Sequence, residues 1–306
     1  IPALTNPPLA NHGAEGLGYL ADSDRVIGVL VGDEFLAVPH NILWHHEVVN
    51  IDDWNGRTFA VTYCPLTGSS LVFDRGPADD AEFGVSGLLF QNNLVMYDRN
   101  ETESLWPQMN RQANCGAAQG TSLLMLPAIE MTWGRWKALH PNSKVVTENT
   151  RFGRDYEADT YPYGNYEDVN NDRVLLDMPI DDRRPPKERL LGIPNGEDGG
   201  VALPFGALNA DSPVRVVRVA VGGTQKTVFW SRAARTAMAF ETTRTFSVDN
   251  GRIVDDETGS VWTVDGRALS GPQAGDQLTP VRDAYVAFWF AWAAFQPETT
   301  IWTPST

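Results

Sequence analysis

An internal repeat is the feature that most restricts how this chain can fold. Four short motifs of the first half return in the same order in the second half. They are RVIGV at 25–29 and RLLGI at 189–193, VP at 38–39 before Leu43 and LP at 203–204 before Leu208, TESLW at 102–106 and TGSVW at 258–262, and WxxWxxxxP at 133–141 and 289–297. Four matches in one order are improbable by chance, so the sequence predicts a tandem duplication of residues 17–150 and 187–306.

Each half reads as a series of short strands. Glycine-punctuated runs of β-branched and aromatic residues at this spacing are typical of a β-sandwich or barrel. We expect strands at 25–31, 34–38, 70–73, 83–85, 93–97 and 144–147, and a helix over 132–139 that ends before Pro141. The fold class is therefore mainly β (β-rich α+β), with two β-sandwich or barrel-like halves packed as a pseudo-symmetric pair. One short helix with core-facing tryptophans closes each half.

Three segments flank or join these halves. Residues 1–16, rich in Pro, Asn and Gly, predict an extended arm, and residues 151–186 predict a connector that wraps over the surface. The tyrosines of the connector either line a carbohydrate or peptide groove or cover apolar surface. The apolar stretch 284–295 is too short to cross a membrane and is expected to be a buried helix.

A hairpin in the first half carries the candidate chemistry. Asn55-Gly56 between two β-rich runs is a strong signal for a type I′ turn. With these two residues as the loop, Trp54 faces Arg57, and counting outward places Glu47 opposite Cys64, with His45 next along the same face. A slip of one residue would bring His46 to the face of Cys64 instead.

These residues suggest a site that binds a metal or a small ligand. A thiolate with one or two imidazoles suits copper or zinc, so we take His45, His46, Glu47 and Cys64 as candidate ligands. The second half has no histidine, so activity is expected in the first half and the second half is treated as degenerate.

Three other interpretations of these residues stay open. Cys64 could be a nucleophile with a histidine as its base, or a buried cysteine that acts only as a small hydrophobe. It could also form a disulfide with Cys115, the one other cysteine of the chain.

Charge and the first residues limit the partners. A net charge of −15 argues against binding to nucleic acid or to an anionic membrane, and no run of apolar residues is long enough for membrane insertion. The chain opens with Ile1-Pro2 rather than Met, which we interpret as an exported protein, extracellular or periplasmic, whose signal peptide has been removed. The arm and exposed sheet edges allow self-association. The alternative function is thus a non-enzymatic structural or self-assembling surface protein.

The motifs WHHEVVN at 44–50, YCPL at 63–66 and FWFAW at 288–292 carry a family resemblance. On the basis of these motifs, the chain resembles the domain-of-unknown-function family 3179 from about residue 20 to residue 302. The resemblance implies export, since members commonly follow a signal peptide, and it implies no activity. Members usually have Tyr-Cys-Pro-Leu-Cys-Gly, whereas Thr67 replaces the second cysteine here, so a Cys-x-x-Cys dithiol is excluded.

Overall fold

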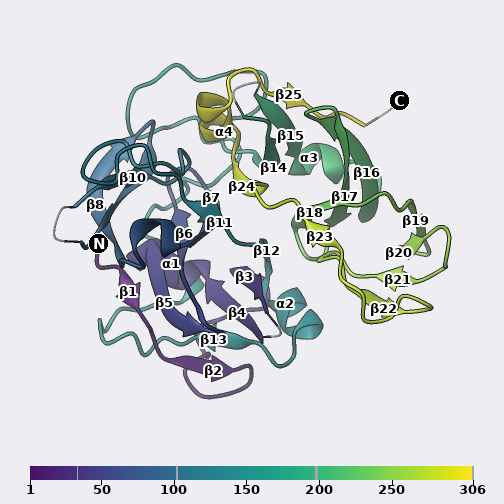
Figure 1. Cartoon of the computed structure of the whole chain (residues 1–306), viewed down its shortest axis with the longest axis horizontal. Helices are drawn as coiled ribbons and strands as arrows, with labels where there is room; N and C mark the ends of the chain where they lie inside the picture. The colour runs from purple at the N-terminus through teal and green to yellow at the C-terminus, as the bar shows by residue number, and fades with distance from the viewer. Residues whose placement is uncertain (33, 101–102, 197–198, 305–306) are drawn as a thin grey trace.

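The computed structural model describes residues 1–32, 34–100, 103–196 and 199–304. The chain is β-rich, with strands β1 to β25 in five sheets and four short α-helices in these residues (Figure 1). None of the five sheets closes on itself within the described ranges, so the barrel-like alternative gives way to open, packed sheets. No helix there is long and apolar enough to cross a membrane.

One long sheet joins the two halves of the chain. Its order is β1 (Leu4–Thr5), β5 (Val48–Trp54), β6 (Arg57–Cys64), β7 (Ser69–Asp74), β24 (Tyr285–Phe288), β14 (Arg189–Pro194), β15 (Gly200–Pro204) and β25 (Thr300–Ile301), with β11 (Leu124–Met125) added to β7. The halves meet where Val286 of β24 pairs with Ser70 of β7 (Figure 1). A shared sheet therefore fixes one half against the other.

Four smaller sheets complete the fold. The first half has β12 (Ala128–Thr132), β3 (Arg25–Val31), β4 (Glu34–Pro39), β13 (Lys144–Val146) and β2 (Leu9–Asn11) in one sheet, and β10 (Leu105–Pro107), β9 (Asn93–Asp98) and β8 (Phe83–Phe90) in another. The second half has β16 (Val214–Val221), β17 (Thr224–Ser231), β18 (Thr236–Glu241) and β23 (Thr279–Pro280), and then β19 (Phe246–Asp249), β20 (Arg252–Asp255), β21 (Val261–Trp262) and β22 (Ala268–Ser270). The helices are α1 (His40–His46), α2 (Trp133–Leu139), α3 (Phe205–Leu208) and α4 (Trp289–Phe295), with 3₁₀ turns at Gly76–Ala78 and Ala158–Thr160.

Matching contacts recur in the two halves. A Cβ at Gly28 would lie 1.8 Å from the ring of Trp136, and one at Gly192 would lie 2.2 Å from the ring of Trp292. Both indole N–H groups donate at 2.9 Å to a hydroxyl seven residues later. These contacts support the repeat and its boundaries, which stay a prediction.

The core extends across both halves. One buried apolar cluster contains Ile27 and Trp136 from the first half and Phe229 and Phe240 from the second. The helix tryptophans Trp133, Trp136, Trp289 and Trp292 are all buried, as the spacing predicts. Stretch 284–295 is buried too, but it begins as strand β24 before it turns into α4.

The predicted hairpin is correct at its turn and wrong at its outer end. Trp54 pairs with Arg57 as expected, but a bulge between Ile51 and Trp54 shifts the register by one residue. Val48 then pairs with Thr62, and the N–H of Tyr63 donates to the carbonyl of Glu47 at 2.8 Å. Glu47 therefore does not face Cys64 across the ladder.

The two histidines of this segment belong to a helix rather than to a strand. Helix α1 runs from His40 to His46 and is buried at five of its seven residues, His40, Asn41, Ile42, Leu43 and His46, so it lies inside the fold rather than on its surface. Glu47 ends the helix with a positive φ of 58°, and its N–H donates to the carbonyl of Leu43. His45 and His46 accordingly lie on different faces from those that the hairpin predicts.

The N-terminal arm packs on its own chain. Leu4 pairs in parallel with Val49, and strand β2 pairs with β13. The connector 151–186 has no strand and one 3₁₀ turn in the described residues, but it buries Tyr156 and Tyr166 against the body. The arm thus covers the first half, whereas the connector contacts both halves and supplies part of the site described next.

Candidate functional site

His46 is committed to contacts within the protein. Its Nδ1 lies 2.7 Å from the carbonyl oxygen of Pro2, and its Nε2 lies 2.6 Å from the hydroxyl of Tyr156. Burial lowers the pKa of His46 to about 4, so the ring is neutral at pH 7. With both nitrogens engaged, the imidazole fixes the arm and the connector to α1 and has no nitrogen free for a metal.

His45 and Cys64 have different neighbours from each other. The His45 ring packs edge-on against Tyr156 at 5.6 Å between centroids. The Cys64 side chain is 1% exposed, and the N–H of Leu94 donates to its Sγ at 3.3 Å. Burial, reinforced by the charge of Glu47, raises the pKa of the thiol to about 11, so Cys64 is not a thiolate at neutral pH.

A buried polar network holds the loop after Cys64. Asn93 Nδ2 donates to Thr67 Oγ1 at 3.0 Å and to Gln108 Oε1 at 2.9 Å, and the Ser69 hydroxyl donates to the same Oε1 at 2.6 Å. All four side chains are fully buried. The network holds Thr67 and Ser69, which follow Cys64 in the chain, and the burial of Cys64 itself supports its interpretation as a core residue. Both cysteines are free thiols, so the predicted disulfide option is wrong.

The copper or zinc site gains no support from this geometry. Within the described ranges, no three His, Cys, Asp or Glu side chains come together in a way that could hold a metal ion. The ligand set His45, His46, Glu47 and Cys64 therefore stays a prediction from sequence alone. Of these four residues, Glu47 is the one whose side chain lines a pocket.

The Glu47 side chain is largely buried, and the amino group of Ile1, which lines the same pocket, is the one charge that acts on its carboxyl group. The residue is 7% exposed, and its carboxyl group takes part in no hydrogen bond or ion pair among the described residues. Burial raises its pKa to about 7, so the carboxyl is close to half ionised at neutral pH. Such a group has a desolvation cost that a hydrogen-bond donor would offset.

Glu47 lines a pocket in the first half. The pocket has a volume of about 420 Å³, which lies in the range of small-molecule sites. Its other lining residues are mostly apolar and come from the N-terminus, the loop after Cys64, strands β8 and β9 and the connector: Ile1, Leu66, Val85, Gly87, Leu88, Leu89, Leu94, Pro162, Tyr163, Tyr166, Arg173 and Leu175. Glu47 is the one carboxylate in this lining.

Aromatic rings of the connector form one wall of this pocket. The rings of Tyr163 and Tyr166 lie 6.4 Å apart at 52°, and the Tyr166 hydroxyl donates to the carbonyl of Leu66 at 2.9 Å. On the Tyr166 ring, the Nζ of Lys187 already sits 3.9 Å from the centroid. The wall thus has the electron-rich faces that attract cations. The sequence pattern showed tyrosines in the connector but not which surface they cover.

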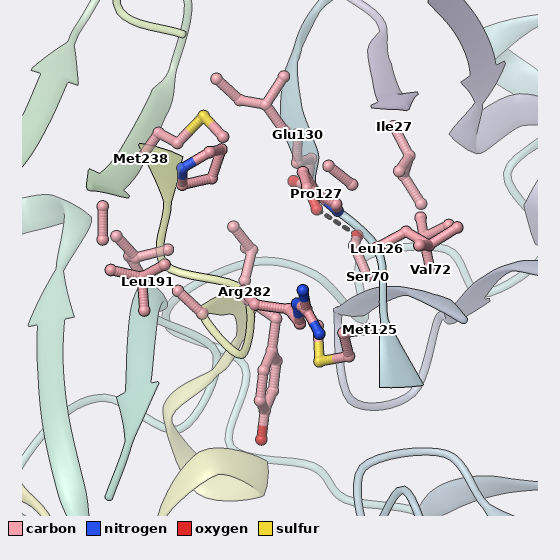
Figure 2. Close-up of a pocket in the computed structure, with 18 of the residues that line it drawn as sticks. Ile27, Ser70, Val72, Met125, Leu126, Pro127, Glu130, Leu191, Met238 and Arg282 are labelled. Carbon is pink, nitrogen blue, oxygen red and sulfur yellow. Dashed lines mark hydrogen bonds between the residues drawn. The ribbon is translucent and has the colours of Figure 1, made fainter. Parts of the chain in front are cut away.

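A second buried group of charges, around Glu130, was missed by the sequence interpretation. Glu130 is 3% exposed and accepts from Arg25 at 2.7 Å, Arg189 at 3.3 Å and the Ser70 hydroxyl, with His40 Nε2 3.5 Å away. The Ser70 bond is drawn in Figure 2, at the edge of a cavity of about 30 Å³ between the halves. That volume has room for about one water molecule, so the group stabilises the fold rather than binding a ligand.

Comparison with known proteins places the chain in a family. The family described as "Protein of unknown function (DUF3179)" matches residues 1–299, and the chain belongs to it. No curated protein and no solved structure matches the chain. Its function must therefore be argued from the site itself.

Proposed function

We propose that this protein binds a small organic amine with an apolar body in the pocket beside Glu47. One observation carries the proposal: a buried carboxyl group without a hydrogen-bond partner among the described residues lines a mostly apolar pocket of about 420 Å³. The missing partner of a carboxylate is a donor, and an ammonium group supplies both the donor and the opposite charge.

The surroundings of the pocket favour the same ligand class. The ring of Tyr163 attracts an ammonium, whereas the ring of Tyr166 already holds Lys187, and the net charge of −15 favours the approach of a cation. The lining has two cations, the amino group of Ile1 and Arg173, and Arg173 is exposed to solvent, which screens its repulsion. The leucine and valine side chains of the lining would contact the apolar body of the ligand.

Calorimetric titration with 2-phenylethylamine tests the proposal. At pH 8 the amine is protonated and Glu47 is mostly ionised, whereas at pH 6 about nine-tenths of Glu47 is protonated, so we expect affinity to be about tenfold higher at pH 8. Glu47→Gln removes the charge and should abolish this pH dependence. The neutral analogue 2-phenylethanol should bind weakly and equally at both pH values.

Two matched variants serve as controls for this titration. Glu34 is exposed on β4, so Glu34→Gln removes one carboxylate elsewhere and should leave the affinity unchanged. Leu89→Trp fills the pocket and should prevent binding, while Leu124→Trp adds the same bulk at an exposed position. Equal affinity for the amine in Glu47→Gln and in Glu34→Gln would contradict the proposal.

Other expectations stay proposals beside this one. Export to an extracellular or periplasmic location is supported by the family resemblance, and the acidic charge supports the absence of nucleic-acid binding. Self-association through sheet edges, as in a structural surface protein, is the alternative function. The arm pairs with β5 and β13 of its own chain, which argues against an arm that exchanges between copies. Sedimentation of the purified protein over a concentration series separates these cases.

A further inference from the structure

A groove along the seam between the two halves is unusually basic for this acidic protein. It has a volume of about 1010 Å³. Four arginines and one carboxylate line it: Arg25, Arg135, Arg232, Arg235 and Asp22. The chain as a whole has 39 Asp and Glu residues against 24 Lys and Arg, so four arginines on one groove depart from the overall balance.

Three of these arginines have no carboxylate partner among the described residues, so their charges can interact with a ligand. Arg135, on α2, and Arg232 and Arg235, in the turn after β17, form no ion pair with a carboxylate among the described residues. Arg232 donates to the side chain and carbonyl of Asn209, which are neutral. Their charges are therefore uncompensated within the described protein.

The remaining charged groups of the groove are already paired. Asp22 binds Lys137 at 2.5 Å, so the one carboxylate of the lining does not neutralise the three arginines. One terminal guanidinium nitrogen of Arg25 donates to Glu130, and the other donates to the carbonyl of Arg235 at 3.1 Å. This last bond fixes the turn that carries Arg232 and Arg235 against the first half.

The wall of the groove also holds an aromatic donor. Trp230 is 3% exposed and packs against Phe205 at 5.0 Å between centroids. Its Nε1–H has no hydrogen-bond acceptor in the part of the chain that the structure describes. The nitrogen is shielded from solvent in this packing, so the arginines are the donors that the groove offers a ligand.

We infer that this groove binds an oxyanion with two or more negative charges, which Arg135, Arg232 and Arg235 hold together. Guanidinium groups recognise carboxylate and phosphate oxygens with paired hydrogen bonds, and three of them at one groove select for multiple charge. Residues of both halves contribute, so the site depends on the packing of the halves against each other. It shares no lining residue with the Glu47 pocket and is independent of the function proposed there.

Titration calorimetry at low ionic strength with citrate and with inorganic pyrophosphate tests this inference. Binding of either anion is expected, with affinity that falls as NaCl is raised, and the preferred anion identifies the ligand as a polycarboxylate or a phosphate compound. Arg135→Gln and Arg235→Gln should each weaken binding about three- to tenfold, and together they should remove it.

Arg57→Gln is the matched control, since Arg57 is an exposed arginine of the β5–β6 hairpin outside the groove lining. It changes the net charge by the same amount and should leave the affinity for the anion unchanged. Circular dichroism of each variant confirms that it is folded. The inference is overturned by a wild-type protein that binds neither anion, or by equal losses in Arg57→Gln and in the groove variants.

Discussion

Arg25 and Arg189 both donate to the same oxygen of Glu130, at 2.7 and 3.3 Å. The two arginines are the first residues of the similar motifs at 25–29 and 189–193, so positions that the predicted repeat makes equivalent meet at one carboxylate. The three side chains are at most 12% exposed. The flanking cations hold the pKa of Glu130 well below its usual range against the effect of burial, and the glutamate is ionised at all ordinary pH values.

Removing this carboxylate should strongly destabilise the protein. In Glu130→Ala, Arg25 is left buried without its counter-charge and Arg189 keeps only Glu167, which costs about 3–5 kcal/mol. Glu82→Ala breaks the exposed pair with Arg99 and should cost less than about 1 kcal/mol. Urea unfolding at pH 7 measures both free energies. Values within 1 kcal/mol of each other would show that the Glu130 group does not hold the halves together.

The free energy of unfolding should depend on the protonation of Glu47. Its folded pKa of about 7 lies above the ordinary value of 4.5, so the folded state holds the proton more tightly than the unfolded state. The contribution of Glu47 to the free energy of unfolding is therefore fully present below about pH 4.5 and is lost as the pH rises through 7. The change amounts to about 3 kcal/mol. In Glu47→Gln this fall should disappear. Urea unfolding at pH 5 and pH 8 measures this fall, with Glu34→Gln as the control. If the free energies of unfolding of the wild type and of Glu47→Gln differ by the same amount at both pH values, the raised pKa is ruled out.

The two cysteines should react at very different rates. Cys115 is exposed, whereas Cys64 is buried and its thiol pKa is raised to about 11. An aromatic disulfide reagent at pH 8 should modify one thiol rapidly in the native protein and the second only after unfolding. Cys115→Ser should remove the rapid phase and Cys64→Ser should leave it. A rapid phase that survives in Cys115→Ser would reopen the nucleophile interpretation of Cys64.

Alanine at Gly28 and at Gly192 should have the same effect, because each glycine lies under a tryptophan of its own half. The added Cβ would lie 1.8 Å from the ring of Trp136 and 2.2 Å from that of Trp292, so the ring or the strand must shift, at a cost of about 2 kcal/mol or more. At Gly18 nothing lies within 4 Å of an added Cβ, and Gly18→Ala should be nearly neutral. Thermal unfolding compares the three variants. A neutral result at either Gly28 or Gly192 would argue against equivalent packing in the two halves.

The sequence predicts local structure well at the hairpin turn and poorly beyond it. Asn55-Gly56 determines that Trp54 faces Arg57, because turn geometry is local. The bulge at Asp52 is not local: its carboxylate binds Arg75 and the side chain of Asn6, both far along the chain. A counting argument cannot include such contacts, so it places Glu47 opposite the wrong residue.

The candidate site was only partly accessible to the same reasoning. Glu47 was identified from its position near two histidines and a cysteine, but its importance comes from being buried without a hydrogen-bond partner among the described residues, which only tertiary structure creates. Tyr163 and Tyr166 were noted as connector residues, and the surface they cover depends on how the connector folds back. Glu130 and Arg189 are separated by 59 residues, and no local pattern pairs them.

Methyl NMR of protein labelled at leucine and valine is the most direct test of the central claim, that an apolar amine binds beside Glu47. On addition of 2-phenylethylamine at pH 8, the methyl signals of Leu66, Val85, Leu89 and Leu94 should shift together and saturate, while those of the second half stay unchanged. The same titration of Glu47→Gln should give much smaller shifts. If these four residues do not respond to millimolar amine, or if shifts spread evenly over both halves, the pocket is not a binding site for this class of ligand.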